Sequence, residues 1–148
     1  MRKSRIALIL YAIALAQTTL IPVASAADVT YNNVVPGRTI RFYIDHSSIS
    51  TFLLEVGGNL LLCAPLGILL PLVSRRLDGV RQVTLVTGAG MLIVETIQGF
   101  CLTGRSFDVD DLILNTAGAA LAYLLYAAAR RVVPPDWTRV KAQTATPA

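Results

Sequence analysis

The residues of this chain that could do chemistry are polar and charged side chains set within or beside long apolar runs. Such groups are costly inside a membrane, so each is a candidate functional group. Glu95 and Gln98 lie three residues apart, on one face of a helix. Spacings of three and four also place later aspartates and an asparagine on one helical stripe. The candidate ligand-binding set is Asn59, Glu95, Gln98, Arg105, Asp108, Asp111 and Asn115.

Three kinds of chemistry fit this set. In a structural interpretation, Glu95 pairs with Arg105, the amides bridge helices, and acidic residues suit a positive helix end. In a second, the groups bind a lipid headgroup or a lipid-linked wall precursor. In a third, Asp108, Asp110 and Asp111 hold a divalent cation, as in a metal-dependent membrane enzyme acting on a phosphorylated lipid. We favour a protein that is not an enzyme and expect no cofactor, because acidic triplets are common at helix starts and no nucleophile–base set accompanies this one.

Four apolar segments must position these groups. Each is close to the roughly 20 residues that a helix needs to cross about 30 Å of hydrocarbon. Lipid cannot satisfy open backbone groups, and four segments cannot close a barrel, so the segments must be helices. We therefore predict an all-α integral membrane protein with about four transmembrane helices, at about 6–26, 54–73, 83–101 and 109–129. These helices form a transmembrane domain of residues 1–130, and residues 131–148 form a disordered cytoplasmic tail.

Basic residues alternate between the gaps that separate these segments. Ten of the 13 Lys and Arg residues lie before the first segment, between the second and third, or after the fourth: Arg2, Lys3, Arg5, Arg75, Arg76, Arg81, Arg130, Arg131, Arg139 and Lys141. The positive-inside rule then predicts that both termini are cytoplasmic. It also predicts that the candidate site residues, which lie toward the opposite helix ends, form one outer-leaflet polar cluster.

The first segment has two interpretations. A basic start, an apolar stretch and Ala24-Ser25-Ala26 match a cleavable signal peptide, whose removal would leave three helices with the N-terminus outside. The same residues fit a retained helix that breaks near Pro22, and we favour this second interpretation.

Prolines within the apolar segments indicate bends, and glycines indicate positions where helices pack closely. Pro65 and Pro71 predict a kink in the second helix. Between the first two helices, residues 28–51 form the longest loop, with a short interfacial helix near 39–43 and a His46 that is solvent-facing or interfacial rather than a ligand. We interpret the glycines within the spans as sites of close helix packing, namely Gly57, Gly58, Gly67, Gly88, Gly90 and Gly118.

Composition excludes several other classes of protein. The chain is 54% hydrophobic and only 15% charged, whereas a soluble domain averages about 25% charged residues. The net charge is +4, but the basic residues lie beside the apolar runs and form no basic face. This distribution argues against a nucleic-acid partner. Cys63 and Cys101 fit no metal-binding spacing.

Three ordered motifs resemble those of VanZ-like membrane proteins. The run N-L-L-L-C-A-P-L-G at 59–67 is similar to the family's N-L-L-x-F-x-P-x-G element, with Cys63 in place of the usual aromatic residue. The E-x-x-Q at 95–98 resembles the family's motif on the next helix. The run from Arg105 to Gly118 resembles the family's R-x-x-D-x-x-D-x-x-x-N-T-x-G signature.

The resemblance implies a multi-pass protein of the bacterial cytoplasmic membrane, associated with the cell envelope. The family's namesake is associated with low-level resistance to the lipoglycopeptide teicoplanin. Partners would be membrane lipids or a lipid-linked cell-wall precursor, with a homo-oligomer as an open alternative. Our leading hypothesis is an outer-leaflet site in which Glu95 and Asp111 recognise charge and Arg105 pairs with an acid or a phosphate, while the amides of Asn59, Gln98 and Asn115 orient the ligand.

Overall fold

The computed structural model describes residues 2–22 and 31–132. Over these residues the chain is helical and contains no strand, so the predicted all-α fold is confirmed. The expected cleavage site at 24–26 and all but the first two residues of the expected tail at 131–148 lie outside the described residues.

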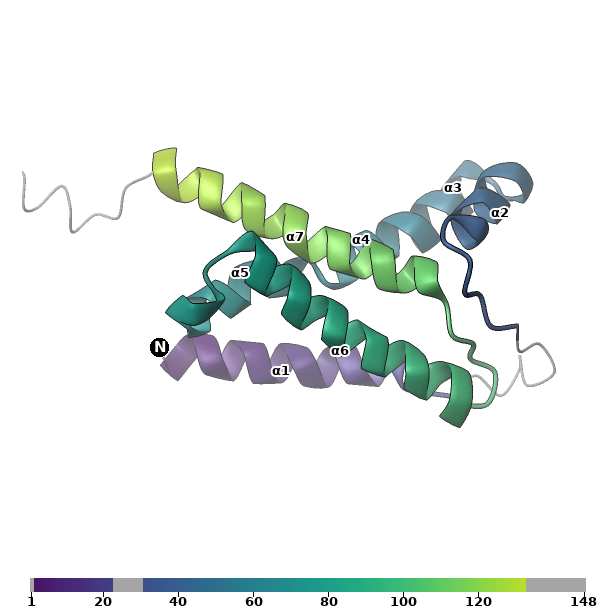
Figure 1. The fold of residues 1–148 in the computed structure, drawn as a ribbon, viewed down its shortest axis with the longest axis horizontal. Helices are drawn as coiled ribbons and strands as arrows, with labels where there is room; N and C mark the ends of the chain where they lie inside the picture. The colour runs from purple at the N-terminus through teal and green to yellow at the C-terminus, as the bar shows by residue number, and fades with distance from the viewer. Residues whose placement is uncertain (1, 23–30, 133–148) are drawn as a thin grey trace, which may run out of the picture.

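The long helices run side by side along one axis, with the short helix α2 at one end (Figure 1). The start of α1, the turn before α6 and the end of α7 lie together at the opposite end (Figure 1). The elements in order are α1 (Arg2–Thr19), α2 (Arg38–His46), α3 (Ile49–Phe52), the π-helical turn η2 (Leu53–Gly57), α4 (Gly58–Leu62), α5 (Ala64–Val73), the 3-10 turn η3 (Arg75–Leu77), α6 (Val80–Cys101) and α7 (Val109–Val132).

Within the part of the chain that the structure describes, three helical segments are long and apolar enough to cross a membrane. They are Ile49–Val73, Val80–Cys101 and Val109–Val132, with 25, 22 and 24 residues. The helix α1 has 18 residues, and its first turn carries Arg2, Lys3 and Arg5, which shortens its apolar part. It ends at Thr19, earlier than the expected end near residue 26.

The segment Ile49–Val73 is bent beside Pro65, one of the two prolines that predicted a kink. Pro65 has no backbone N–H, and the helix breaks beside it at Cys63, where the Leu66 N–H bonds to the Cys63 carbonyl at 3.0 Å. The Leu62 carbonyl instead accepts a hydrogen bond from the Tyr11 hydroxyl of α1. Pro71 lies inside α5 without ending it. The kink therefore comes from Pro65, and α1 supplies a partner for a carbonyl beside it.

Two glycines allow the bent segment to pack closely on α7. A Cβ on Gly118 would meet the backbone of Leu60, and a Cβ on Gly67 would lie 2.7 Å from the Tyr123 nitrogen. The packing interpretation holds for these two. It is wrong for Gly57, Gly58 and Gly90, because an added Cβ at those positions would have no neighbour within 4 Å.

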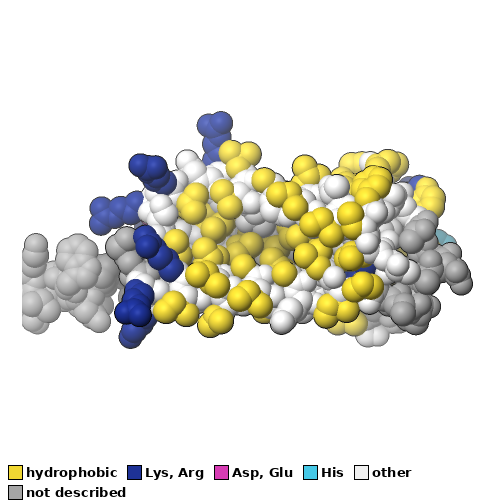
Figure 2. Space-filling view, turned by 90° about the horizontal axis from the view of Figure 1, so that it is seen from below, with side chains coloured by type: hydrophobic (Ala, Val, Ile, Leu, Met, Phe, Trp, Pro, Cys, Tyr) yellow, Lys and Arg dark blue, Asp and Glu magenta, His cyan; other side chains and the backbone are white. Residues whose placement is uncertain are grey.

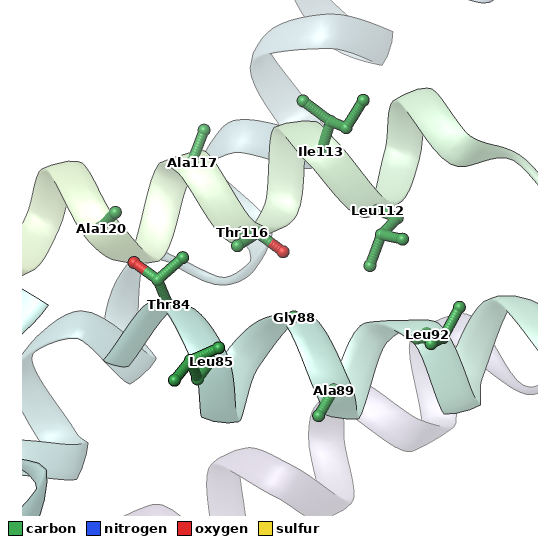
Figure 3. Close-up of a pocket in the computed structure, with 10 residues that line it drawn as sticks. All are labelled: Thr84, Leu85, Gly88, Ala89, Leu92, Leu112, Ile113, Thr116, Ala117 and Ala120. Atoms are coloured by element: carbon green, nitrogen blue, oxygen red, sulfur yellow. The ribbon is translucent and has the colours of Figure 1, made fainter. Parts of the chain in front are cut away.

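An open apolar groove of about 610 Å³ lies between α6 and α7 (Figure 3). Gly88 lies opposite Thr116 across it, and an added Cβ would be 3.5 Å from the Thr116 Oγ1 atom, an ordinary contact. Small residues of both helices therefore face each other across the middle of the groove. The full lining is Thr84, Leu85, Gly88, Ala89, Leu92, Leu112, Ile113, Thr116, Ala117 and Ala120.

Charge and apolar surface are separated along the long axis. Lys and Arg side chains gather at one end, and hydrophobic side chains cover most of the face beyond it (Figure 2). We call this the basic end; it carries Arg2, Lys3, Arg5, Arg75, Arg76, Arg81, Arg130 and Arg131. We call the opposite end, which holds α2 and the start of α7, the polar end.

Candidate functional site

At the polar end, the carboxylate of Asp110 holds the start of α2. Asp110 is fully buried in the first turn of α7. It accepts hydrogen bonds from the backbone N–H groups of Gly37 at 2.5 Å, Thr39 at 2.7 Å and Ile40 at 3.3 Å. The first N–H groups of a helix have no partner within it, and a negative charge there is favourable. One buried carboxylate therefore anchors α2 to α7.

Asp108 fixes the segment that leads into α2. One of its carboxylate oxygens accepts from the Asn33 amide at 2.9 Å, and the other accepts from the Thr39 hydroxyl at 2.6 Å. The backbone of Asn33 also bonds to both neighbours of Asp108, to the Phe107 carbonyl at 2.7 Å and the Val109 N–H at 2.9 Å. Asn33 is only 4% exposed, so the segment lies firmly against the start of α7.

Glu95 supports this arrangement from α6. Its side chain is 2% exposed, and one carboxylate oxygen accepts from the backbone N–H of Asp108 at 2.9 Å. The expected ion pair between Glu95 and Arg105 does not form. The Arg105 guanidinium turns instead to the end of α1, where it donates to the carbonyls of Thr18 and Ile21, both at 3.2 Å. A cation is favourable at a helix C-terminus, which explains the different partner.

Gln98 also binds the end of α1. Its amide nitrogen donates to the Thr19 carbonyl at 2.8 Å. The last carbonyls of a helix lack intrahelical partners, and Gln98 and Arg105 supply donors to them. One of these, the Thr18 carbonyl, would otherwise pair with the backbone N–H that Pro22 lacks. These contacts account for the end of α1 at Thr19.

Asn59, Asp111 and Asn115 form a second polar contact, between α4 and α7. The Asn59 amide donates to the Asp111 carboxylate at 2.6 Å, and the Asn115 amide donates to the Asn59 side-chain oxygen at 3.2 Å. The Asn115 amide also reaches the Asp111 carbonyl at 2.8 Å. The amides therefore bridge helices, as the structural interpretation expected.

The structure thus brings the seven candidate residues to one end but into separate contacts. Glu95 meets Asp108, whereas Gln98 and Arg105 both bind α1. Sequence reasoning missed Asn33 and Thr39, which connect α2 to α7. The sequence signal near these two residues is Pro36-Gly37, a turn-forming pair directly before the start of α2. In the structure Gly37 has a φ of 84°, in the left-handed region that favours glycine.

A pocket of about 480 Å³ opens beside these contacts. Arg38 lies 4.6 Å from the centre of the Tyr31 ring and donates to the Tyr31 hydroxyl. Burial raises the pKa of Tyr43, and nearby carboxylates add to this effect, so its hydroxyl stays protonated. The pocket combines a cation, aromatic rings and hydroxyls; its lining is Tyr31, Asn33, Arg38, Thr39, Phe42, Tyr43 and Asp108. Among the seven candidates, Asp108 alone lines it.

The aspartates are not arranged as a metal site. Within residues 2–22 and 31–132, no three His, Cys, Asp or Glu side chains are placed to hold an ion together. Both oxygens of Asp110 accept backbone N–H bonds under α2, and Asp111 faces Asn59. His46 is exposed at the end of α2, as expected.

These features define a class: an all-helical multi-pass membrane protein with a polar network at one end of its helices. The chain belongs to the VanZ/LLP1 family, whose model matches residues 8–130. That match runs from within α1 to within the last turn of α7 and confirms the resemblance seen in the three motifs. No curated protein and no solved structure matches the chain.

Proposed function

We propose that this protein binds the headgroup of a lipid-borne ligand in the outer leaflet of the bacterial cytoplasmic membrane. The observation that carries the proposal is the pocket at the polar end, in which Arg38 and three aromatic residues surround an open space. A guanidinium suits a phosphate, and aromatic faces suit a sugar or the interfacial part of a lipid.

The proposal includes four membrane passages with both termini in the cytoplasm. Charge supports this orientation, because the basic end gathers eight of the described basic residues, as the positive-inside rule requires of a cytoplasmic side. The helix α1 packs against α5 along the bundle, and its apolar part, from Ile6 to Thr19, spans about 21 Å. Leu20 and Ile21 extend that apolar stretch, and Arg2, Lys3 and Arg5 can reach outward to the interface.

The location of α2 supports a site at the membrane surface. Its apolar Phe42 and Ile44 are exposed, as are Ile49, Leu53 and Leu54 in the segment that follows. Such a surface favours a helix that lies in the interfacial plane. A ligand whose lipid tail remains in the outer leaflet would then present its headgroup to the pocket beside α2.

The remaining candidate residues have a positioning role in this proposal. Glu95 binds the backbone of Asp108, Asp108 holds the segment before α2, and Asp110 holds α2 itself. Glu95, Asp111 and the amides would therefore shape the site, whereas Arg38 would touch the ligand. An enzyme that uses metal-bound aspartates is less favoured, because these carboxylates already accept hydrogen bonds from the protein.

The ligand class covers phospholipid headgroups, lipid-linked wall precursors and lipoglycopeptides such as teicoplanin. The direct test titrates the purified full chain in detergent with three probes: phosphatidylglycerol, a polyprenyl-diphosphate disaccharide and teicoplanin. The variant is Arg38→Gln, and the matched control is Arg41→Gln on the same helix. Arg41 is exposed, forms an ion pair with Asp45 at 3.5 Å, and does not line the pocket.

We expect at least one probe to bind, and its affinity to fall about tenfold in Arg38→Gln but not in Arg41→Gln. Equal affinities in the two variants would contradict the pocket assignment. A susceptibility series in a Gram-positive host gives a second readout. We expect the protein to protect against teicoplanin and not vancomycin, with protection lost in Arg38→Gln at unchanged membrane levels.

A further inference from the structure

A second pocket, of about 680 Å³, lies at the basic end. Four arginines from three elements line it: Arg5 from α1, Arg75 and Arg76 from η3, and Arg130 from α7. Residues far apart in the sequence thus bring four positive charges to one hollow.

Among the residues that the structure describes, the pocket lining holds one acidic side chain to offset this charge. Asp78 lines the pocket and accepts two hydrogen bonds from the Arg130 guanidinium, at 2.8 and 3.0 Å. Arg130 also lies 4.5 Å from the centre of the Tyr126 ring, which holds it in place. Within the described parts of the chain, no carboxylate pairs with Arg5, Arg75 or Arg76. The pocket therefore has a surplus of positive charge that an anion would neutralise.

The positive-inside rule explains why basic residues lie at this end, but not why four of them converge on one pocket. Arg81 and Arg131 lie at the same end, are exposed, and do not line it. The convergence is a local property of the α1, η3 and α7 ends, and it requires an explanation of its own.

The rest of the lining indicates what kind of anion fits. Leu72 and Val73 continue the apolar surface of α5 into the pocket, and Ser74 follows them at its end. An anion attached to an acyl chain would place its charge among the arginines and its chain along α5. Guanidinium groups match phosphate oxygens, and basic pockets between membrane helices bind anionic lipid headgroups. We propose that this pocket binds the phosphate headgroup of an anionic phospholipid of the adjoining leaflet.

The test counts lipids bound to the full chain in detergent by native mass spectrometry. The probes are dioleoyl phosphatidylglycerol, dioleoyl phosphatidylcholine and inorganic phosphate. The variant Arg75→Gln/Arg76→Gln removes two pocket charges, and the control Arg81→Gln/Arg131→Gln removes two charges beside the pocket. All four side chains are exposed, so the fold should persist, and helicity by circular dichroism checks this. A single pair, Arg5→Gln against Arg2→Gln, repeats the comparison on α1.

We expect wild type and control to prefer phosphatidylglycerol over phosphatidylcholine, and Arg75→Gln/Arg76→Gln to bind phosphatidylglycerol about 30-fold more weakly. Arg5→Gln should weaken binding and Arg2→Gln should not. Equal weakening in variant and control would overturn the proposal, because overall charge would then explain binding. Equal affinity for the two lipids would also overturn it. Displacement of the lipid by millimolar inorganic phosphate would overturn the assignment to a lipid and leave a free anion as the ligand.

Discussion

At the residue scale, the polar groups of the helices work mainly by satisfying backbone groups of other elements. Asp110 accepts from the start of α2, and Arg105 and Gln98 donate to the end of α1. Each interaction connects a side chain to a helix terminus that has no partner of its own. The polar network thus positions a loop and a short helix around the pocket.

Asp110→Asn should loosen α2. Both carboxylate oxygens of Asp110 accept backbone N–H groups, and asparagine would replace one of them with an NH₂ donor. The hydrogen bonds to that oxygen would be lost, and the other oxygen would no longer be charged. We expect faster hydrogen exchange over residues 31–46 and a loss of about 2 kcal/mol of stability, with little change in α6. Asp45→Asn, on the exposed face of α2, serves as control. Unchanged exchange at 31–46 would contradict the anchoring role.

Asp78 makes a pH-dependent contribution at the basic end. The hydrogen bond from Arg130 is the main cause that lowers the pKa of Asp78 below its ordinary value of 3.8. A carboxylate whose pKa is lowered in the folded state stabilises the fold at pH values above its ordinary pKa. This contribution is lost as the pH falls through the pKa of the folded state. The pair is partly exposed, so its contribution is below about 1 kcal/mol.

The measurement compares melting temperatures of wild type and Asp78→Asn between pH 7 and pH 3. Wild type should be slightly more stable at neutral pH, and the difference should shrink below about pH 3.8. A constant difference across this range would show that the charge of Asp78 does not stabilise the fold. Asp45→Asn again provides a comparison at an exposed ion pair.

At the element scale, close packing of the bent segment on α7 depends on missing side chains. Gly118 lies against the backbone of Leu60, so Gly118→Ala must push α4 away from α7. We expect a loss of about 1–3 kcal/mol, seen as a lower melting temperature in detergent. Gly90→Ala, on α6, is the matched control, because its added methyl group meets nothing within 4 Å. Equal melting temperatures for both variants would contradict the close contact.

A bend in the segment Ile49–Val73 accompanies the contact between α4 and Asp111. The helix breaks at Cys63 because Pro65 lacks an N–H, and a π-helical turn precedes α4. Prolines are visible in the sequence, so the kink could be predicted. The π-helical turn could not, because nothing in the residues Leu53–Gly57 distinguishes it from an ordinary turn of helix.

At the scale of the whole molecule, the separation of basic and polar ends predicts an orientation that native cysteines can test. Cys101 is exposed at the end of α6, near the polar end, whereas Cys63 is buried in the bundle. A membrane-impermeant maleimide should label intact cells at Cys101, and Cys101→Ser should abolish the signal. Labelling that requires lysed cells would contradict an outward-facing polar end. Cys63→Ser, which leaves Cys101 in place, is the control.

The sequence by itself determined the properties that depend on local composition. Apolar segments of membrane-spanning length require helices, alternating Lys and Arg predict the charged end, and the spacing of polar residues predicts a cluster at the other. The three motifs were sufficient to suggest the family that the comparison confirmed.

Only the tertiary structure decided which groups meet. Asp110 binds residues more than 70 positions away, and Arg105 reaches a carbonyl 84 positions away in preference to the nearer Glu95. Such choices depend on where each helix ends and how the helices are turned about their axes, because hydrogen bonds require distances near 3 Å. The pockets at the two ends depend on the same geometry, since each is lined by elements that are distant in the sequence.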